Sequence, residues 1–125
     1  MVVYTDAKTR AFEKSLAWAG KAAMRGQKPL LGPLVVAVEA IFGVPPSWPL
    51  SKRDKALAGL VRPMGGTADC DNIFKTIDGL QGIAFENDSQ IVKASVEKFY
   101  GETPMLQIQI SPLEIGLLER AVEVG

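Results

Sequence analysis

The chain has 125 residues, a length that suits one domain able to bury a sizeable core. Apolar residues make up 47% and charged residues 22%, as in ordinary globular proteins. The first residues, MVVYTDAKTR, contain no apolar block of the kind found in signal peptides, so we expect no secretory leader. No apolar run approaches the roughly 20 residues that a membrane span needs, so no membrane partner is expected. The single cysteine, Cys70, allows no intrachain disulfide, and we therefore expect a reducing compartment, the cytoplasm.

The chain contains no histidine, and this absence narrows the chemistry. Catalysis by Ser-His or Cys-His pairs is excluded, and so are nearly all zinc sites. A bound metal would need oxygen ligands, which points to magnesium, manganese or calcium. Carboxylates, lysines and such a metal are the groups that remain for catalysis.

The net charge is zero, but its two signs are unevenly distributed. Residues 1–62 hold ten Lys/Arg against four Asp/Glu, a balance of +6, and residues 63–125 hold four against ten, a balance of −6. A basic half beside an acidic half suits a nuclease, in which one surface attracts phosphates and the other concentrates metal. Two solvated faces of different charge explain the same numbers equally well.

The first half of the chain predicts a helix, a strand and a basic segment. Residues 6–25 have helical spacing of apolar positions, with Thr5 or Asp6 as the cap and Gly26 as the stop. Residues 34–42 alternate with apolar residues on both faces, which predicts a central strand. Glu39 is the exception in this strand, and we interpret it as a carboxylate near the sheet rim.

Residues 44–66 combine prolines with basic side chains, and we expect a mobile basic arm there. A short helix over 51–59 is possible within it. The basic residues of this segment are Lys52, Arg53, Lys55 and Arg62.

The second half predicts a helix over about 70–80, ended by Gly79 or Gly82, and then two strands over 91–100 and 105–110. The two strands are expected to pair as a hairpin across the turn GETP. Ser111 to Glu114 form a capping box that predicts a final helix to about 123. The expected fold class is therefore α/β (α+β), a single domain over 1–125 with a small mixed β-sheet flanked by helices.

A cluster of acids marks the start of the 70–80 helix in the stretch TADCDNIFKT. Asp71 and Lys75 are four residues apart on one helical face, and Asp69 precedes them. Asp88 lies in the turn FENDSQ, which the chain can bring back to the helix start. Three converging carboxylates would hold a magnesium ion that activates water, and Lys75 would neutralise charge on a phosphate.

Each of these residues also has a purely structural interpretation. Aspartate caps helix starts, Asn-Asp is a common turn pair, and Lys75 suits an exposed helix surface. A calcium-binding loop is excluded, because the twelfth position counted from Asp69 is Leu80, where a bidentate acid is required.

The stretch DCDNIFKTIDGLQGIAFENDSQI resembles the signature of the RusA family of Holliday junction resolvases, which phages and prophages mostly carry. That signature has D-x-D-N, a lysine four residues after the second aspartate, then D-[AG]-L and an acidic turn followed by x-Q-[IV]. VYTDAKTRAFE, PSWPLSKRDKAL and VEKFYGETP are similar to other segments of the family, so the resemblance covers about residues 2–110.

The resemblance implies a homodimeric, magnesium-dependent endonuclease that nicks four-way DNA junctions symmetrically during recombination and repair, with manganese as a possible substitute ion. By position, Asp69, Asp71 and Asp88 match the metal-binding acids and Lys75 the essential lysine. The basic residues expected to contact DNA are Lys8, Arg10, Lys52, Arg53, Lys55 and Arg62.

The chain departs from the family pattern at several positions. Asn87 stands where an acid is common, so it would bind metal only through its carbonyl or not at all, and Glu86 could compensate. Cys70 replaces an apolar residue and is interpreted as a small buried side chain, while Asp78 is interpreted as a partner of Lys75. The family's first strand is expected to be missing, which would leave a sheet edge unpaired.

Two other functions remain open at this stage. An inactive junction-binding remnant of a prophage resolvase would keep the dimer and the basic surface. A structural dimer would use the acids only as helix caps.

Overall fold

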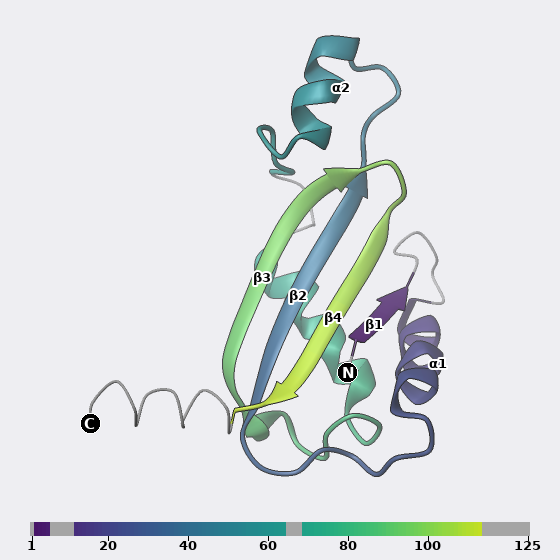
Figure 1. The fold of residues 1–125 in the computed structure, drawn as a ribbon, viewed down its shortest axis with the longest axis vertical. Coiled ribbons are helices and arrows are strands. Elements are labelled where there is room, and N and C mark those ends of the chain that lie inside the picture. Colours follow the sequence, from purple (N-terminus) through teal and green to yellow (C-terminus); the bar gives the residue numbers. More distant parts are fainter. Residues whose placement is uncertain (1, 6–11, 65–68, 114–125) are drawn as a thin grey trace, which may run out of the picture.

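The computed structural model describes residues 2–5, 12–64 and 69–113, and they form an α+β domain around one sheet (Figure 1). The helices and strands are, in order, β1 Val2–Thr5, α1 Phe12–Met24, β2 Leu34–Gly43, α2 Leu50–Leu57, α3 Cys70–Lys75, β3 Ile91–Gly101 and β4 Met105–Pro112. Two 3-10 segments, η1 Thr76–Leu80 and η2 Asp88–Gln90, lie between α3 and β3.

The sheet is mixed and has the strand order β1-β4-β2-β3. β2 runs parallel to β3, with Val35 opposite Lys93, and antiparallel to β4, with Val38 opposite Ile108. The expected fold class is confirmed, and so is the central position of β2. Because β2 has a neighbouring strand on each side, both of its edges are hydrogen-bonded within the sheet.

The expected hairpin is wrong, because β3 and β4 lie on opposite sides of β2. The link Glu102–Pro104 crosses the end of β2, and three extended residues span about 10 Å, roughly twice the spacing of neighbouring strands. The link is therefore long enough for a direct hairpin and also for an arrangement with β3 and β4 on opposite sides of β2. Burial explains the one observed: Leu106, Ile108 and Ile110 of β4 are buried, whereas no residue of β3 is.

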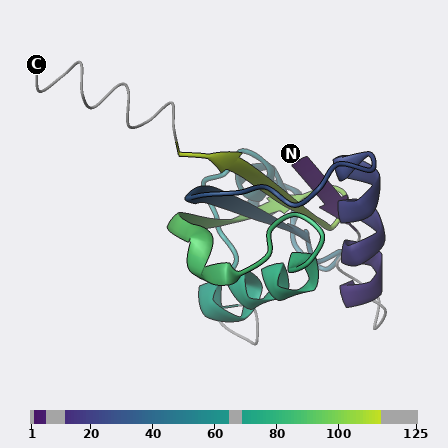
Figure 2. The ribbon, with the colours of Figure 1, turned by 90° about the horizontal axis from the view of Figure 1, so that it is seen from below.

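The core lies between one face of the sheet and the helical segments. Figure 2 shows α3 and the 3-10 segments on one side of the sheet and α1 alongside β1. Alternate residues of β2, from Leu34 to Ala40, are buried, as their two-residue period requires. Phe85, which follows η1, is fully buried in the same cluster.

The opposite face of the sheet is covered by none of the described helices (Figure 2). This explains Glu39, which lies within β2 between Glu97 of β3 and Gln107 of β4, and not at the rim as expected. Its side chain is half-buried, and the open face leaves its carboxylate access to water, so a central position is tolerated.

The ends of several elements also differ from expectation. Thr5 ends β1, a strand that the sequence analysis did not predict, which pairs with Leu106 to Gln109 of β4 and covers that part of its edge. Asp6 lies outside the described residues. α1 ends at Met24, followed by positive φ angles at Arg25 and Gly26, as the predicted stop requires.

The predicted 70–80 helix divides into α3 and η1 at Thr76, whose hydroxyl donates a 2.6 Å hydrogen bond to the carbonyl of Ile73. Ser111 and Pro112 belong to β4, so the predicted capping box does not begin a helix there. The remainder of the predicted final helix, over 114–123, lies outside the described residues.

The strand order predicts unequal sensitivity to truncation. We expect Ile108→Ala in β4 to lower the free energy of unfolding by about 2–5 kcal/mol, because its fully buried side chain leaves a cavity. Val92→Ala in β3, whose side chain is 57% exposed, should change the unfolding free energy by no more than about 0.5 kcal/mol. Urea unfolding followed by circular dichroism measures both, and equal losses would contradict the observed strand order.

Candidate active site

Asp69 and Asp71 lie at the start of α3, where the local backbone explains both. Asp69 is the N-cap, with extended backbone angles, and its Oδ1 accepts a 2.9 Å hydrogen bond from the backbone N–H of Asn72. Asp71 lies in the exposed first turn, where a negative charge is favoured by the helix dipole. The capping interpretation of Asp69 is thus correct, and this hydrogen bond uses one of its two carboxylate oxygens.

Lys75 ends α3 four residues after Asp71, so the two share a face of the helix one turn apart. The side chains of Ile73, Ile77 and Leu80 point into the core from the opposite face. The burial of these three apolar residues keeps Lys75 and Asp78 turned towards solvent.

Asp88 lies in η2, and a hydrogen-bonded turn holds it in place. Asn87 caps η2, with Oδ1 accepting a 2.9 Å hydrogen bond from the N–H of Ser89. This contact gives Asn87 a structural role in the turn. Glu86 is exposed beside it.

Gln90 links this turn to the loop that precedes β2, a role that the sequence analysis missed. Its Oε1 accepts hydrogen bonds from the N–H groups of Glu86 and Asn87 at 3.0 and 3.1 Å. Its Nε2 donates to the carbonyls of Leu30 and Gly32, each at 3.0 Å. The glutamine of the x-Q-[IV] pattern was the available sequence signal, and the structure explains it as the residue that positions Asp88.

A pocket of about 350 Å³ brings the helix and the turn together. Its lining comes from α3, η1, η2 and the first half of β3, and consists of Phe74, Lys75, Ile77, Asp78, Asp88, Ile91 and Ala94. Lys75 and Asp88, which the sequence analysis selected separately, thus face the same space. Asp78 joins them, in keeping with its expected place near Lys75.

Asp69 and Asp71 are not part of that lining. Within the described part of the chain, no three acidic or cysteine side chains are close enough to one another to hold a metal ion. The carboxylate oxygens are nevertheless the donors that magnesium prefers, and all three predicted ligands are exposed. Core packing does not fix these side chains, and a metal ion shared by the three carboxylates remains a prediction.

Cys70 is exposed, and the expectation of a buried side chain is wrong. It is the first residue of α3, on the turn that carries Asp71, and the core-facing positions of the helix begin with Ile73.

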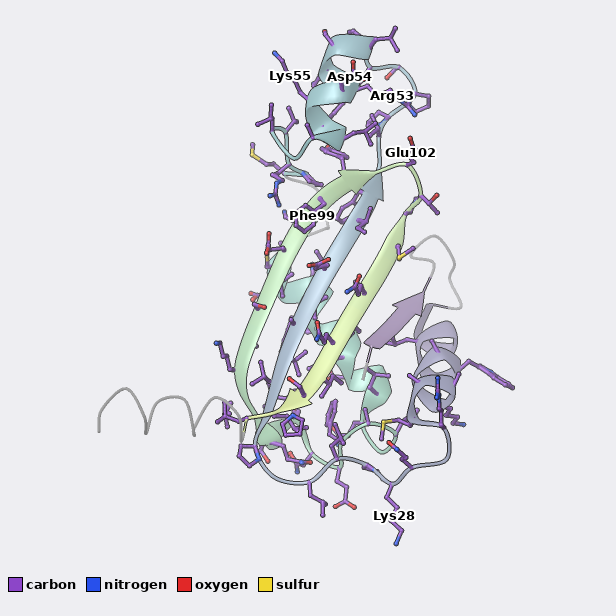
Figure 3. All side chains as sticks on the ribbon, viewed as in Figure 1. Lys28, Arg53, Asp54, Lys55, Phe99 and Glu102 are labelled. Atoms are coloured by element: carbon purple, nitrogen blue, oxygen red, sulfur yellow. The ribbon has the colours of Figure 1, made fainter. Side chains whose placement is uncertain are left out.

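The basic arm contains helix α2, which lies beyond the ends of β2 and β3 (Figure 1). Its base is held by aromatic contacts: the ring of Trp48 packs edge-on against Tyr100 at 5.1 Å, and Lys52 Nζ lies 3.9 Å from the Trp48 ring centre. Figure 3 shows Arg53 and Lys55 on α2, away from the sheet. The mobility of the arm remains a prediction.

Arg62 anchors the arm to β3. Its Nη1 donates to the carbonyl of Lys98 at 3.0 Å and lies 3.5 Å from Glu97, while its guanidinium stacks 4.1 Å from the centre of the Phe99 ring. Its Nε donates to the carbonyl of Gly59 at 3.0 Å. These contacts give Arg62 a structural role, and a DNA contact by this residue remains a prediction.

Lys8 and Arg10 lie outside the described residues. No helix within the described ranges has the length and apolar character needed to cross a membrane.

The protein is thus an α+β protein with a mixed sheet. On the face of the sheet that the helices cover, it has a pocket lined by acidic residues and a lysine. Comparison with known families matches residues 2–111 to the family described as "Endodeoxyribonuclease RusA", and the chain belongs to this family. It is also similar to the "Uncharacterized protein YqaN" of Bacillus subtilis (strain 168), with 36% identity over 84 residues. That match covers 65% of this chain and 58% of the relative, so it spans less than two thirds of the curated protein. No solved structure matches the chain.

The hydrogen bonds of Gln90 predict a positioning role that can be measured. We expect Gln90→Ala to lower the free energy of unfolding by about 2 kcal/mol, because backbone groups at both ends of the contact lose their partner. Gln90→Glu keeps an acceptor for the two N–H groups but cannot donate to the carbonyls, so its loss should be intermediate.

Gln81→Ala is the matched control, since Gln81 is exposed and its side chain shows none of these contacts. Chemical denaturation of the three variants provides the comparison. Equal stability of Gln90→Ala and Gln81→Ala would show that Gln90 does not hold the turn.

Proposed function

We propose that this protein is a magnesium-dependent endodeoxyribonuclease that resolves four-way DNA junctions as a homodimer, acting in the cytoplasm in recombination and repair. The observation that carries the proposal is the pocket shared by Lys75 and Asp88, in a chain of the RusA family. A homodimer suits the reaction, since two symmetric nicks need two active sites related by a two-fold axis.

In this proposal the metal ligands are Asp69, Asp71 and Asp88, with magnesium as the ion and manganese as a substitute. Magnesium, when bound, would lower the pKa of a coordinated water and offset charge on the scissile phosphate. Asp69 can keep its cap hydrogen bond through Oδ1 while its second oxygen faces a cation. Asp88 would complete the set from the turn that Gln90 holds against the loop before β2.

Lys75 supplies the positive charge that belongs to the protein itself. It lines the pocket beside Asp88, and it lies between Asp71, four residues earlier, and Asp78, three residues later. From this position the ammonium group would donate to a phosphate oxygen as negative charge develops. The pocket also has an apolar side, which includes Phe74 and Ile91.

The arm supplies the non-specific attraction for DNA. Lys52, Arg53 and Lys55 lie on an exposed helix at one end of the sheet, away from the acidic residues of the pocket. Phosphates held by the arm release counterions, and this binding is insensitive to sequence. Lys8, Arg10 and Arg62 extend the proposed DNA surface, as the family resemblance suggests.

An inactive junction-binding protein is the second candidate. The observation that favours it is the separation of the described carboxylates, which do not form a ready set of metal ligands. Cleavage of a labelled four-way junction, with and without magnesium, separates the two candidates. We expect symmetric nicks that require the metal, and binding without cleavage at any magnesium or manganese concentration would favour the second candidate.

The roles of Asp88 and Lys75 predict distinct defects. Asp88→Asn should abolish cleavage and reduce magnesium binding, because a charged ligand is lost, while junction binding persists. Lys75→Met should bind magnesium at least as well as the parent, because a competing positive charge is removed, yet cleave about 10²-fold more slowly.

Lys28→Met is the control for Lys75→Met, since Lys28 is exposed in the loop before β2 (Figure 3). Single-turnover cleavage and magnesium titration provide the two measurements. Recovery of Lys75→Met at high magnesium would mean that the lysine only shapes the metal site.

The arm predicts a change in salt dependence. Replacing Lys52, Arg53 and Lys55 together with glutamine should weaken junction binding and lower the slope of log K against log salt by up to about 3, near 0.9 for each lost phosphate contact. Replacing Lys21, Arg25 and Lys28, three exposed basic residues outside the arm, with glutamine is the control for the loss of three charges. If the triple variant kept the parent's slope, the arm would not be part of the DNA-binding surface.

A further inference from the structure

β3 is an edge strand with an unpaired side. Its 11 residues bond to β2 along one edge, and the described residues place no strand along the other. Residues Val92 to Ser95 are exposed, and the strand has no fully buried side chain. A long edge strand of this kind presents unpaired backbone groups that another strand can bind.

Two features limit the accessible part of this edge. At one end, the register with β2 shifts between Ile91 and Lys93, so Val92 forms a bulge. At the other end, Arg62 occupies the carbonyl of Lys98. Both features disfavour strand pairing where they occur. The part of the edge that remains available for pairing is the segment between them, Lys93–Glu97.

This segment, KASVE, is complementary to itself in the antiparallel direction. When two copies are aligned about Ser95, Lys93 of each copy lies opposite Glu97 of the other, and Ala94 lies opposite Val96. Shifting the alignment centre to Ala94 or Val96 loses both Lys–Glu pairs. Opposite charges that face each other stabilise a strand pair. Because the two-fold axis repeats the Lys93–Glu97 pair, the dimer would contain this contact twice.

The backbone direction agrees with the same alignment. Arg62 bonds the carbonyl of Lys98, which identifies the even-numbered residues of β3 as those directed away from β2. Ala94 and Val96 are therefore the residues able to exchange hydrogen bonds with the second copy. The Lys93–Glu97 and Ser95–Ser95 pairs then fall at non-hydrogen-bonded positions, where facing side chains are closest.

We propose that two copies of this chain pair through β3, antiparallel and centred on Ser95, so that two four-stranded sheets form one continuous sheet of eight strands. This inference rests on the homodimer of the proposed function and supplies its interface. A two-fold axis normal to the sheet keeps both helical layers on one side. Ala94, which lines the candidate pocket, lies beside the axis, so both pockets face the same side of the dimer close to its centre.

A short ladder alone buries less surface than a stable interface requires, and the arm supplies more. Leu60 and Met64, which are 76% and 88% exposed, are each two residues from Arg62 and hence near the C-terminal half of β3. Antiparallel pairing brings that half alongside the N-terminal half of the other copy, where Val92 is 57% exposed. These apolar side chains can extend the contact beyond the ladder.

Charge reversal tests the proposal through the oligomeric state of the full chain. The parent should sediment as a dimer, and Lys93→Glu or Glu97→Lys should each raise the dimer dissociation constant about tenfold or more, since like charges then face each other twice. The double variant Lys93→Glu/Glu97→Lys restores the facing opposite charges and should dimerise more tightly than either single variant, although Arg62 loses the carboxylate 3.5 Å from its Nη1. Lys28→Glu, in an exposed loop away from β3, is the control and should leave the dissociation constant unchanged.

A disulfide test locates the axis. In a Cys70→Ser background, Ser95→Cys should give a cross-linked dimer on oxidation, because the new cysteine faces its own copy, whereas Ser51→Cys on exposed α2 should not. A monomeric parent, or a dimer that ignores both single charge reversals, would overturn the pairing through β3. Neither result depends on junction cleavage, so an intact β3 dimer that fails to cut junctions would count against the nuclease proposal alone.

Discussion

The packing of Ile73, Ile77 and Leu80 against the sheet is the interaction on which the candidate site depends. These side chains are at most 8% exposed, and their helical spacing continues from α3 into η1 although the backbone changes to a tighter helix. By fixing one face of this segment in the core, they direct Lys75 and Asp78 to the pocket. The same burial ties α3 to β2 and β4, whose inward residues form the other side of the core.

Gln90 complements this packing with polar contacts that hold the acidic turn. The hydrogen bonds from its single amide group join residues about sixty positions apart in the chain, and they set the place of Asp88 relative to the sheet. The candidate site thus has a rigid frame and exposed reactive side chains. Such a frame would let the carboxylates adjust around the metal of the proposed function, since their rotation does not disturb the core.

The uneven cover of the sheet organises the rest of the molecule. Among the described residues, one face of the sheet carries α3, the 3-10 segments and the pocket, no helix covers the other face around Glu39, and β3 is the last strand on its side. Arg62 and Trp48 attach the basic arm to the far half of β3, so positive charge is separated from the acidic pocket by the length of that strand. Pairing through β3, as proposed, would place two pockets side by side on the helical face.

The sequence by itself determined the features that depend on neighbouring residues. The alternation of β2, the helix in the arm, and the spacing of Asp69, Asp71 and Lys75 are local patterns, and each was recovered because strand and helix periods act over a few residues. Only the tertiary structure decided the order of β3 and β4, the exposure of Cys70, and the anchoring by Arg62. Each of these depends on contacts between distant segments, and a link as short as Glu102–Pro104 or a cysteine at a helix start is compatible with more than one arrangement until the whole core is packed.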